Sequence, residues 1–428
     1  MKKLYMETFG CWLNKADSLI MKQILEEKGY TPVSSPDRAD VILLNTCAVR
    51  ADTERKIVRR LKELSRLVDK GKVLVVAGCL ASARPGLVKS VAPKAKLLSP
   101  NMIEEVHKLI EEEEFMLRGI RRGKVLPRYE GGVRYVVPIA SGCLGSCAYC
   151  IGKLGRGVLI SYPEDLIVEN IKYAVEHGAK EIYLTGQDAA AYGFDRGTNL
   201  VSLVKKILRR VEGSYKIRIG MMEPSLVMKI IDGLIELYED ERLYRYAHIP
   251  AQSGDDEVLK LIGRRYSVDE YVELIRFLRD RYPDITIATD IMVGLPGEDE
   301  EAFKRTLKLI EIIEPDKVHI ARFTPRIGTE AMLMKDVPEP VKKRRSRELT
   351  ALAHRIALRR NRKLVGSIRR ALMTEQDHGK VLGRLDNYKL VILNAVHNVK
   401  IGEFILVKIV YASHTSLSGV LHNKLSIE

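Results

Sequence analysis

The chain has 428 residues, 46% of them hydrophobic and 30% charged, which is long enough for about two to four domains. Its 71 Lys and Arg residues outnumber 56 Asp and Glu residues, and the formal charge of +15 favours a polyanionic partner. There is no apolar run near the ~20 residues of a membrane span and no N-terminal apolar signal segment, which predicts a cytoplasmic protein without a membrane partner.

The first predicted domain, residues 1–111, alternates short apolar strands with helical stretches. This pattern is typical of a parallel sheet covered by helices. The expected strands are Lys3–Thr8, Val41–Asn45, Val73–Ala77 and Lys96–Leu98. Residues 112–132 contain basic residues and glycines and are expected to form a linker.

The second predicted domain, residues 133–363, contains six strand–helix units in a row. Such a series indicates a partial TIM-type barrel, so that the fold class is α/β. The expected strands are Tyr135–Ala140, Glu181–Thr185, Lys216–Gly220, Tyr246–Ile249, Thr286–Thr289 and Val318–Phe323.

The third predicted domain, residues 364–428, has short β-rich runs separated by Gly, Asn and His turns. Examples are Tyr388–Leu393 and Phe404–Tyr411. Runs of this kind indicate a small β-barrel of OB-like type. Its aromatic residues Tyr388, Phe404 and Tyr411 are core candidates, or alternatively platforms for stacked bases.

The positive charge is clustered, which favours nucleic-acid binding over a uniformly solvated surface. One cluster lies in the linker and includes Arg118, Arg121, Arg122, Lys124 and Arg128. A longer one runs from Lys342 to Arg370 and leads into the third domain, where we expect it to contact RNA phosphates.

Three of the six cysteines, Cys143, Cys147 and Cys150, form a CxxxCxxC pattern directly after the first barrel strand. Three thiolates on one loop suit a soft metal centre. A disulfide would leave an odd cysteine, and zinc, the alternative, would need a fourth ligand that the nearby sequence lacks. A 4Fe-4S cluster on three cysteines leaves one iron open to S-adenosylmethionine (SAM). This motif, with Tyr149 before its last cysteine, resembles that of the radical SAM superfamily.

The other three cysteines each follow a strand of the first domain. Cys11, Cys47 and Cys79 come after the first, second and third strands. Loops after the carboxyl ends of parallel strands lie along one edge, so these thiols are expected to converge. They are interpreted as ligands of a second cluster, and three buried structural cysteines are the alternative.

The whole chain resembles the methylthiotransferase family, in which a cluster domain precedes a radical SAM barrel and a C-terminal barrel called TRAM. The resemblance rests on motifs in family order: Gly10-Cys11, Asn45-Thr46-Cys47, Ala77-Gly78-Cys79, Thr185-Gly186-Gln187-Asp188, His248-Ile249-Pro250-Ala251-Gln252-Ser253-Gly254, Gly294-Leu295-Pro296-Gly297-Glu298, Phe323-Thr324-Pro325-Arg326 and Ser416-Leu417-Ser418-Gly419.

Within this family the chain is most similar to the branch acting on N(6)-threonylcarbamoyladenosine beside the tRNA anticodon. Lys153 stands where other branches tend to have Pro. The substrate ends in a carboxylate, which Lys153 or Arg156, next to the cluster cysteines, could pair with. A surface lysine is the alternative for Lys153.

The resemblance also implies SAM contacts at the carboxyl ends of the barrel strands. The residues in question are Tyr149, Gly186, Gln187, Gln252, Val293 and Gly294. Glu223 is added as a further candidate, although the branch usually has Asn there. A simple tight turn is the alternative for the Gly294 segment.

The resemblance implies two 4Fe-4S clusters and SAM as cofactors, and the anticodon stem–loop of tRNA, an electron donor and a sulfur donor as partners. Carbon 2 of adenine offers ordinary acid–base catalysis little to work with, so the cofactors are expected to carry the hard step. Two alternatives stay open. One is the same chemistry on isopentenyl-adenosine or on a ribosomal protein aspartate, and the other is a non-catalytic iron–sulfur RNA-binding protein.

Overall fold

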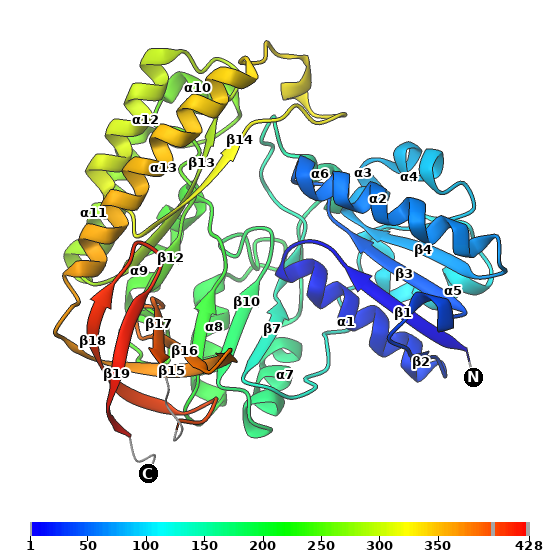
Figure 1. Ribbon diagram of the computed structural model, residues 1–428, viewed down its shortest axis with the longest axis horizontal. Coiled ribbons are helices and arrows are strands. Elements are labelled where there is room, and N and C mark those ends of the chain that lie inside the picture. The colour runs from blue at the N-terminus through cyan, green and yellow to red at the C-terminus, as the bar shows by residue number, and fades with distance from the viewer. Residues whose placement is uncertain (1, 395–398, 425–428) are drawn as a thin grey trace.

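The computed structural model describes residues 2–394 and 399–424, which form three parts (Figure 1). An N-terminal α/β domain lies beside a partial barrel of parallel strands, and a small closed β-barrel packs against the base of the partial barrel (Figure 1). The fold class predicted from the sequence is confirmed in all three parts.

The N-terminal domain is built on a parallel sheet in the order β2-β1-β3-β4-β5-β6. All four predicted strands are present, and the two-residue edge strands β2 and β6 were not predicted. The elements are β1 (Lys3–Thr8), α1 (Trp12–Glu27), β2 (Thr31–Pro32), β3 (Val41–Thr46), α2 (Ala51–Val68), β4 (Val73–Gly78), α3 (Cys79–Ala83), α4 (Pro85–Val91), β5 (Lys96–Leu98), α5 (Val106–Glu111) and β6 (Phe115–Met116), with 3-10 helices at Pro36–Arg38 and Pro100–Glu105.

Helices cover both faces of this sheet, so β3 is buried along its whole length. Successive strand residues point to opposite faces. Accordingly Ile42 and Leu44 pack with Leu61 of α2, whereas Leu43 packs with Ile20 of α1. This packing explains why the strand is an unbroken apolar run.

The second domain contains the six predicted barrel strands in two three-stranded parallel sheets, β7-β10-β11 and β12-β13-β14. A parallel bridge between Met221 and His248 connects the two sheets. The elements are β7 (Arg134–Pro138), β8 (Ala140–Ser141), α6 (Ile151–Arg156), β9 (Ile160–Ser161), α7 (Glu164–Glu176), β10 (Glu181–Thr185), α8 (Leu200–Arg210), β11 (Lys216–Ile219), α9 (Pro224–Leu237), β12 (Tyr246–His248), α10 (Asp256–Leu261), α11 (Val268–Arg281), β13 (Thr286–Val293), α12 (Glu300–Ile313), β14 (Lys317–Arg322) and α13 (Glu339–Arg362), with a 3-10 helix at Glu330–Leu333.

The C-terminal strands close into a five-stranded barrel in the order β15-β16-β17-β19-β18. They are β15 (Ile368–Asp377), β16 (Lys380–Leu385), β17 (Leu390–Asn394), β18 (Phe404–Ala412) and β19 (Leu417–Lys424). Tyr388, between β16 and β17, reaches into the partial barrel, where its hydroxyl is hydrogen-bonded to that of Tyr183. Its ring also lies 4.9 Å and 4.7 Å from the rings of Tyr244 and Tyr246. Tyr388 therefore anchors the small barrel to the large one.

Residues 112–132 are more closely packed than a solvated linker. The segment adds β6 to the N-terminal sheet. Arg121 is 2% exposed and forms an ion pair of 2.8 Å with Asp17 of α1. A buried cation requires a partner, so this pairing fixes the segment against the domain.

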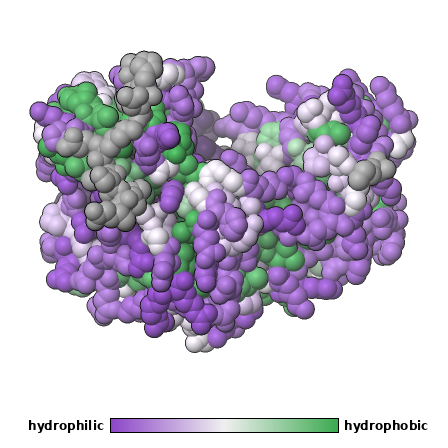
Figure 2. All heavy atoms as spheres, turned by 90° about the horizontal axis from the view of Figure 1, so that it is seen from below, coloured by the Kyte–Doolittle hydropathy of each residue, from purple (hydrophilic) through white to green (hydrophobic). Residues whose placement is uncertain are grey.

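Among the described residues, there is no helix that is both long and apolar enough to cross a membrane. The face seen in Figure 2 is hydrophilic over most of its area, and its hydrophobic side chains are confined to smaller patches.

Candidate functional site

The three N-terminal cysteines lie at the carboxyl edge of the parallel sheet. Cys11 precedes α1, Cys47 follows β3, and Cys79 begins α3 directly after β4. A Cβ atom built on Gly10 would lie 3.0 Å from the Cβ of Cys47, so the Cys11 loop lies against Cys47. Burial raises the pKa of the Cys79 thiol to about 11, and Cys47 and Cys11 act in the same direction. The three thiols are thus close enough to influence one another.

The other cysteine set lies on the loop between β8 and α6. The amide of Gly145 donates to Sγ of Cys143 at 3.2 Å. A Cβ atom on Gly145 would approach the sulfurs of Cys143 and Cys147 to 3.4 Å and 3.7 Å. Burial raises the pKa of Cys143 to about 11, and the thiols of Cys147 and Cys150 raise it as well. The Cys143 thiol would stay protonated at neutral pH unless a metal stabilised its thiolate.

Each set of three cysteines fits an iron–sulfur cluster better than mononuclear zinc. All six cysteines are free. Zinc would bring three sulfurs within about 4 Å of one another, because Zn–S bonds are about 2.3 Å. Neither cysteine set is so compact. Within the described part of the chain, the group of three potential ligands whose atoms all lie within 4.8 Å of one another is His248, Asp290 and His319. Three cysteines without a fourth ligand leave one iron of a four-iron cluster open.

The two cysteine sets lie at opposite ends of α6. Cys150 immediately precedes this six-residue helix, which is about 9 Å long at 1.5 Å per residue. Near its other end, a Cβ atom on Gly155 would be 3.1 Å from the Cβ of Cys79. The structure therefore brings the cysteines of two domains to the same region.

The predicted substrate cations Lys153 and Arg156 are both engaged within the protein. Lys153 donates from Nζ to the carbonyl oxygen of Cys143 at 2.6 Å. Arg156 is 1% exposed and donates to Asn14 Oδ1 and Asp17 Oδ2, both at 2.6 Å. The expectation that Arg156 pairs with a substrate carboxylate is wrong, since its guanidinium is enclosed between the two domains. Lys153 therefore holds the Cys143–Cys150 loop, which we call the cluster loop.

Three of the predicted cofactor residues surround the Cys143–Cys150 loop. Tyr149 accepts a hydrogen bond from Arg264 Nη2 at 2.6 Å. Gln187, next to the half-buried Gly186, donates from Nε2 to the carbonyl of Gly152 at 3.3 Å. Glu223 caps α9 through the amide of Leu226 and lies 3.8 Å from Arg264 Nη1.

Arg264 and Asp188 are site residues that the sequence reasoning missed. Arg264 connects Tyr149 with Glu223 and also lies close enough to Cys147 to lower the pKa of that thiol, against the larger effect of burial. Asp188 is 2% exposed, and its Oδ1 accepts the amides of Ala190 and Glu223 at 3.1 Å each. Asp188 stands in the Thr185–Asp188 motif, which was a signal for it, whereas Arg264 follows α10 without a motif.

The remaining predicted cofactor residues lie at the carboxyl ends of β12 and β13. Gln252 has a positive φ of 66°, and its amide donates to the carbonyl of Asp290 at 2.8 Å. Val293 is fully buried. Gly294 also has a positive φ, of 73°, and Lys342 packs so closely on it that a Cβ would lie 2.3 Å from Lys342 Cγ. A glycine is therefore required at this turn.

A cleft of about 660 Å³ lies between the N-terminal domain and the partial barrel. Its N-terminal wall is Val49–Ala51 with Asp52 and Arg55, and its floor includes Tyr149 and Cys150. The opposite wall is formed by β14 and α13, with the side chains of Met292 and Arg322. A ligand in this cleft would reach the cluster loop from a polar rim.

Comparisons with known proteins find matches to three protein families along the chain. Residues 3–99 match the uncharacterized protein family UPF0004, residues 137–310 the radical SAM superfamily and residues 362–421 the TRAM domain. A protein of Pyrococcus abyssi named probable threonylcarbamoyladenosine tRNA methylthiotransferase is 40% identical, over 98% of this chain and 99% of its own. The Homo sapiens threonylcarbamoyladenosine tRNA methylthiotransferase is 32% identical, over 88% of this chain and 66% of its own.

The chain belongs to the threonylcarbamoyladenosine tRNA methylthiotransferase family. It is a radical SAM enzyme, and this superfamily uses SAM and a 4Fe-4S cluster. The radical SAM methyltransferase TsrM from Kitasatospora setae has a similar fold, with a TM-score of 0.56 and 13% identity over 75% of this chain and 73% of its own.

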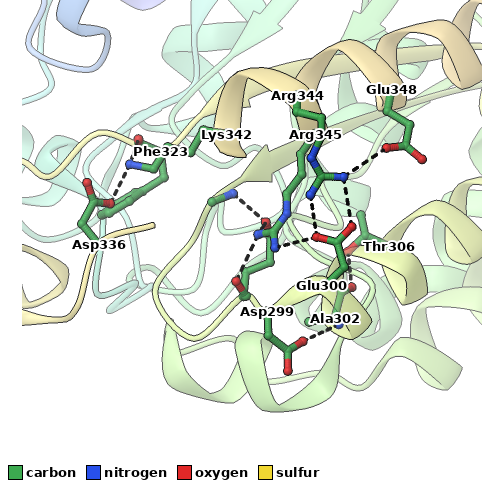
Figure 3. Close-up of polar contacts among 12 residues, drawn as sticks. Asp299, Glu300, Ala302, Thr306, Phe323, Asp336, Lys342, Arg344, Arg345 and Glu348 are labelled. Atoms are coloured by element: carbon green, nitrogen blue, oxygen red, sulfur yellow. Dashed lines mark hydrogen bonds and ion pairs between the residues drawn. The ribbon is translucent and has the colours of Figure 1, made fainter. Parts of the chain in front are cut away.

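The family's members are named tRNA methylthiotransferases, so we asked which cations of the basic stretch from Lys342 to Arg370 are open to RNA. Figure 3 shows that the cations at the start of this stretch already have partners within the protein. Lys342 donates to the carbonyl of Phe323 at 2.9 Å and to Asp336 at 2.6 Å. Arg345 is 3% exposed and forms an ion pair of 2.7 Å with Glu298. These two cations cannot contact RNA phosphates, contrary to the sequence-based expectation.

Other members of the basic stretch remain accessible. Among the exposed side chains of α13 are Lys343, Arg347, Arg355 and Arg362. Of the aromatic residues considered for base stacking, Tyr388 and Phe404 are occupied in packing, and Tyr411 is 64% exposed. Of these three aromatic residues, Tyr411 is therefore the one whose ring is accessible for a base to stack on.

Proposed function

We propose that this enzyme adds a methylthio group to carbon 2 of N(6)-threonylcarbamoyladenosine beside the tRNA anticodon. The observation that carries the proposal is the placement of two three-cysteine sets, from two domains, at opposite ends of α6. Each set would hold a 4Fe-4S cluster: Cys143, Cys147 and Cys150 the one that binds SAM, and Cys11, Cys47 and Cys79 the auxiliary one.

The target carbon carries neither an acidic proton nor a leaving group, so side-chain acids and bases cannot activate it. When bound, the SAM cluster supplies the electron that converts SAM into the agent of hydrogen removal. The protein's own residues then position and shield the reaction. Tyr149, Gln187 and Glu223 lie around the loop where SAM would bind, with Gly186, Gln252, Val293 and Gly294 at the neighbouring strand ends.

The cleft between the N-terminal domain and the barrel is the proposed entrance for the tRNA. Its volume of about 660 Å³ accommodates one unstacked modified base. Arg50, Arg55 and Arg322 at its rim suit the phosphates on either side of that base. The anticodon stem–loop would extend from this rim towards the exposed face of α13.

The proposed domains are residues 1–111 for the auxiliary cluster, 133–363 for the radical SAM barrel and 364–428 for the TRAM barrel, with 112–132 between the first two. The proposed methylthio transfer also requires an electron donor and a sulfur donor as partners. We place the reaction in the cytoplasm, because its tRNA substrate is found there.

The test is an anaerobic reaction of the reconstituted protein with SAM, a reductant, a sulfur source and tRNA. Mass spectrometry of nuclease digests should show the methylthio product where threonylcarbamoyladenosine is present, and none on tRNA that lacks it. Equal modification of isopentenyl-bearing tRNA, or of a ribosomal protein, would assign the chain to another branch of this chemistry. Clusters without any SAM cleavage would favour a non-catalytic RNA-binding role.

A further inference from the structure

A second cavity, of about 630 Å³, lies at the base of the partial barrel, where the TRAM barrel and α13 close it. Four Lys and Arg residues line it. Lys389 is paired with Asp316, and the other three come from different elements: Arg218 of β11, Lys317 of β14 and Arg384 of β16. Because β16 belongs to the TRAM barrel, this group of cations exists only when the two domains are docked.

These three cations lack acidic partners. Within residues 2–394 and 399–424, none of the ion pairs involves Arg218, Lys317 or Arg384. The Nε atoms of Arg218 and Arg384 are buried without a hydrogen-bond partner. The guanidinium of Arg218 lies over the rings of Tyr246 and Tyr388, at 5.1 Å and 5.3 Å from their centroids. The Lys317 side chain is exposed at the start of β14, yet desolvation and, after it, the two guanidiniums lower its pKa.

The acidic residues close to this cavity are already engaged. Asp316 accepts hydrogen bonds from Arg360 at 2.7 Å and from Lys389 at 2.6 Å. Asp290 is hydrogen-bonded to His248 at 2.8 Å. By contrast, the buried cations Lys342 and Arg345 of α13 each have a carboxylate partner (Figure 3). Arg218 and Arg384 are half-buried without a counter-charge, and an anion from outside the chain would neutralise the charge of this group.

The cavity adjoins the proposed substrate cleft. Ile320 of β14 and Thr350 of α13 line both spaces. A base seated in the cleft near Cys150 would therefore have the cationic cavity on the far side of these two residues. A substituent several bonds long would be needed to bridge from the base to the cations.

We propose that the Arg218–Lys317–Arg384 cavity binds the carboxylate of the substrate's threonylcarbamoyl group. This inference rests on the proposed function and assigns its specificity to residues outside the cluster loop. Lys153 and Arg156 are engaged within the protein, whereas Arg218 and Arg384 each have an Nε without a hydrogen-bond partner, and the one side-chain hydrogen bond of Arg218 among the described residues is a long one of 3.5 Å to Tyr246. A guanidinium and an ammonium together suit a carboxylate through charge-assisted hydrogen bonds. A backbone phosphate of the RNA shares this chemistry, and the experiment must separate the two sources.

The experiment uses the full-length reconstituted protein and two synthetic anticodon stem–loops. One carries threonylcarbamoyladenosine, and the other carries its neutral carboxamide. Dissociation constants and kcat/KM are measured for the parent, Lys317→Met, the charge-conserving Lys317→Arg and the matched control Lys343→Met, which removes an exposed lysine of α13. Melting temperatures accompany each variant, and Lys317→Met should change stability little, because Lys317 is exposed and takes part in no ion pair within the described residues.

The parent should prefer the carboxylate over the carboxamide by about ten- to a hundredfold in binding and in kcat/KM. Lys317→Met should lose most of this preference, and Lys317→Arg and Lys343→Met should keep it. Equal affinity of the parent for both stem–loops would overturn the proposal. So would an equal loss on both stem–loops in Lys317→Met with a smaller salt dependence, which would indicate a phosphate. A charge preference that depends on Lys317 without any methylthio product would support the cavity and refute the proposed reaction.

Discussion

Arg156 of the barrel and Asp17 of the N-terminal domain form a buried ion pair, with 2.6 Å between Nη2 and Oδ2. Arg121 adds a second guanidinium at 2.8 Å from Oδ1 of the same carboxylate. Arg156 stands six residues after Cys150 and Asp17 six residues after Cys11. The pair therefore connects the two segments that carry the cysteine sets and holds them in a defined relation.

Asp17→Asn should destabilise the protein by about 3–5 kcal/mol, because two buried guanidiniums would lose their shared counter-charge. Chemical denaturation followed by circular dichroism would measure this change. The matched control is Asp69→Asn, whose carboxylate pairs with Lys94 on the surface with both side chains 69% exposed, and which should change stability little. Similar midpoints for the two variants would show that the domain contact does not depend on this pair.

Replacing Cys143, Cys147 and Cys150 together by Ala should halve the iron bound after anaerobic reconstitution, because the other cysteine set lies in a separate domain. The variant should also lose SAM cleavage, measured as 5′-deoxyadenosine by liquid chromatography. Cleavage at the parent's rate would mean that these cysteines do not hold the SAM-binding cluster.

Replacing Cys11, Cys47 and Cys79 together by Ala should separate the two halves of the reaction. The variant should still form 5′-deoxyadenosine but give no methylthio product, because the cluster loop of the barrel is intact. Iron content and mass spectrometry of the digested tRNA measure the two effects. A methylthio yield equal to the parent's would remove the auxiliary set from the reaction.

Asp188→Asn should stabilise the protein increasingly as the pH rises from about 4 to 6. Burial raises the pKa of Asp188 to about 6, so the folded state binds this proton more tightly than the unfolded state. Ionisation therefore costs stability between the two pKa values, by at most about 3 kcal/mol at pH 7. Asparagine keeps the acceptor oxygen and avoids this cost. Urea denaturation across the pH range measures the difference, and a pH-independent difference would contradict the prediction.

Changing Arg347, Arg355 and Arg362 to Gln should weaken tRNA binding and flatten its salt dependence, because these exposed cations of α13 are free to meet phosphates. Each lost phosphate contact removes about 0.7–0.9 from the slope of log K against log salt. Lys94→Gln, on the N-terminal domain, is the control. An unchanged slope would move the contact elsewhere, with Arg118 and Arg122 as the next candidates. Deleting residues 364–428 is a less specific test, because removal of Tyr388 would open the base of the barrel.

The sequence by itself determined the strand–helix order, the six-strand partial barrel, the closed C-terminal barrel and the positions of both cysteine sets. These features follow from local signals, since hydrophobic periodicity sets the elements and a parallel sheet places the loops after its strands along one edge. The convergence of Cys11, Cys47 and Cys79 was therefore predictable before their contacts were known.

Only the tertiary structure decided which cations are free. Lys153, Arg156, Lys342 and Arg345 read in sequence as cations available to a substrate or to RNA, yet each is engaged by a partner within the protein, and for Arg156 that partner lies in the other domain. Conversely, Arg218, Lys317 and Arg384 carry no motif and come together only when the TRAM barrel docks under the partial barrel. Charge pairing depends on the distance between atoms of separate elements, and that distance is set by how the domains pack.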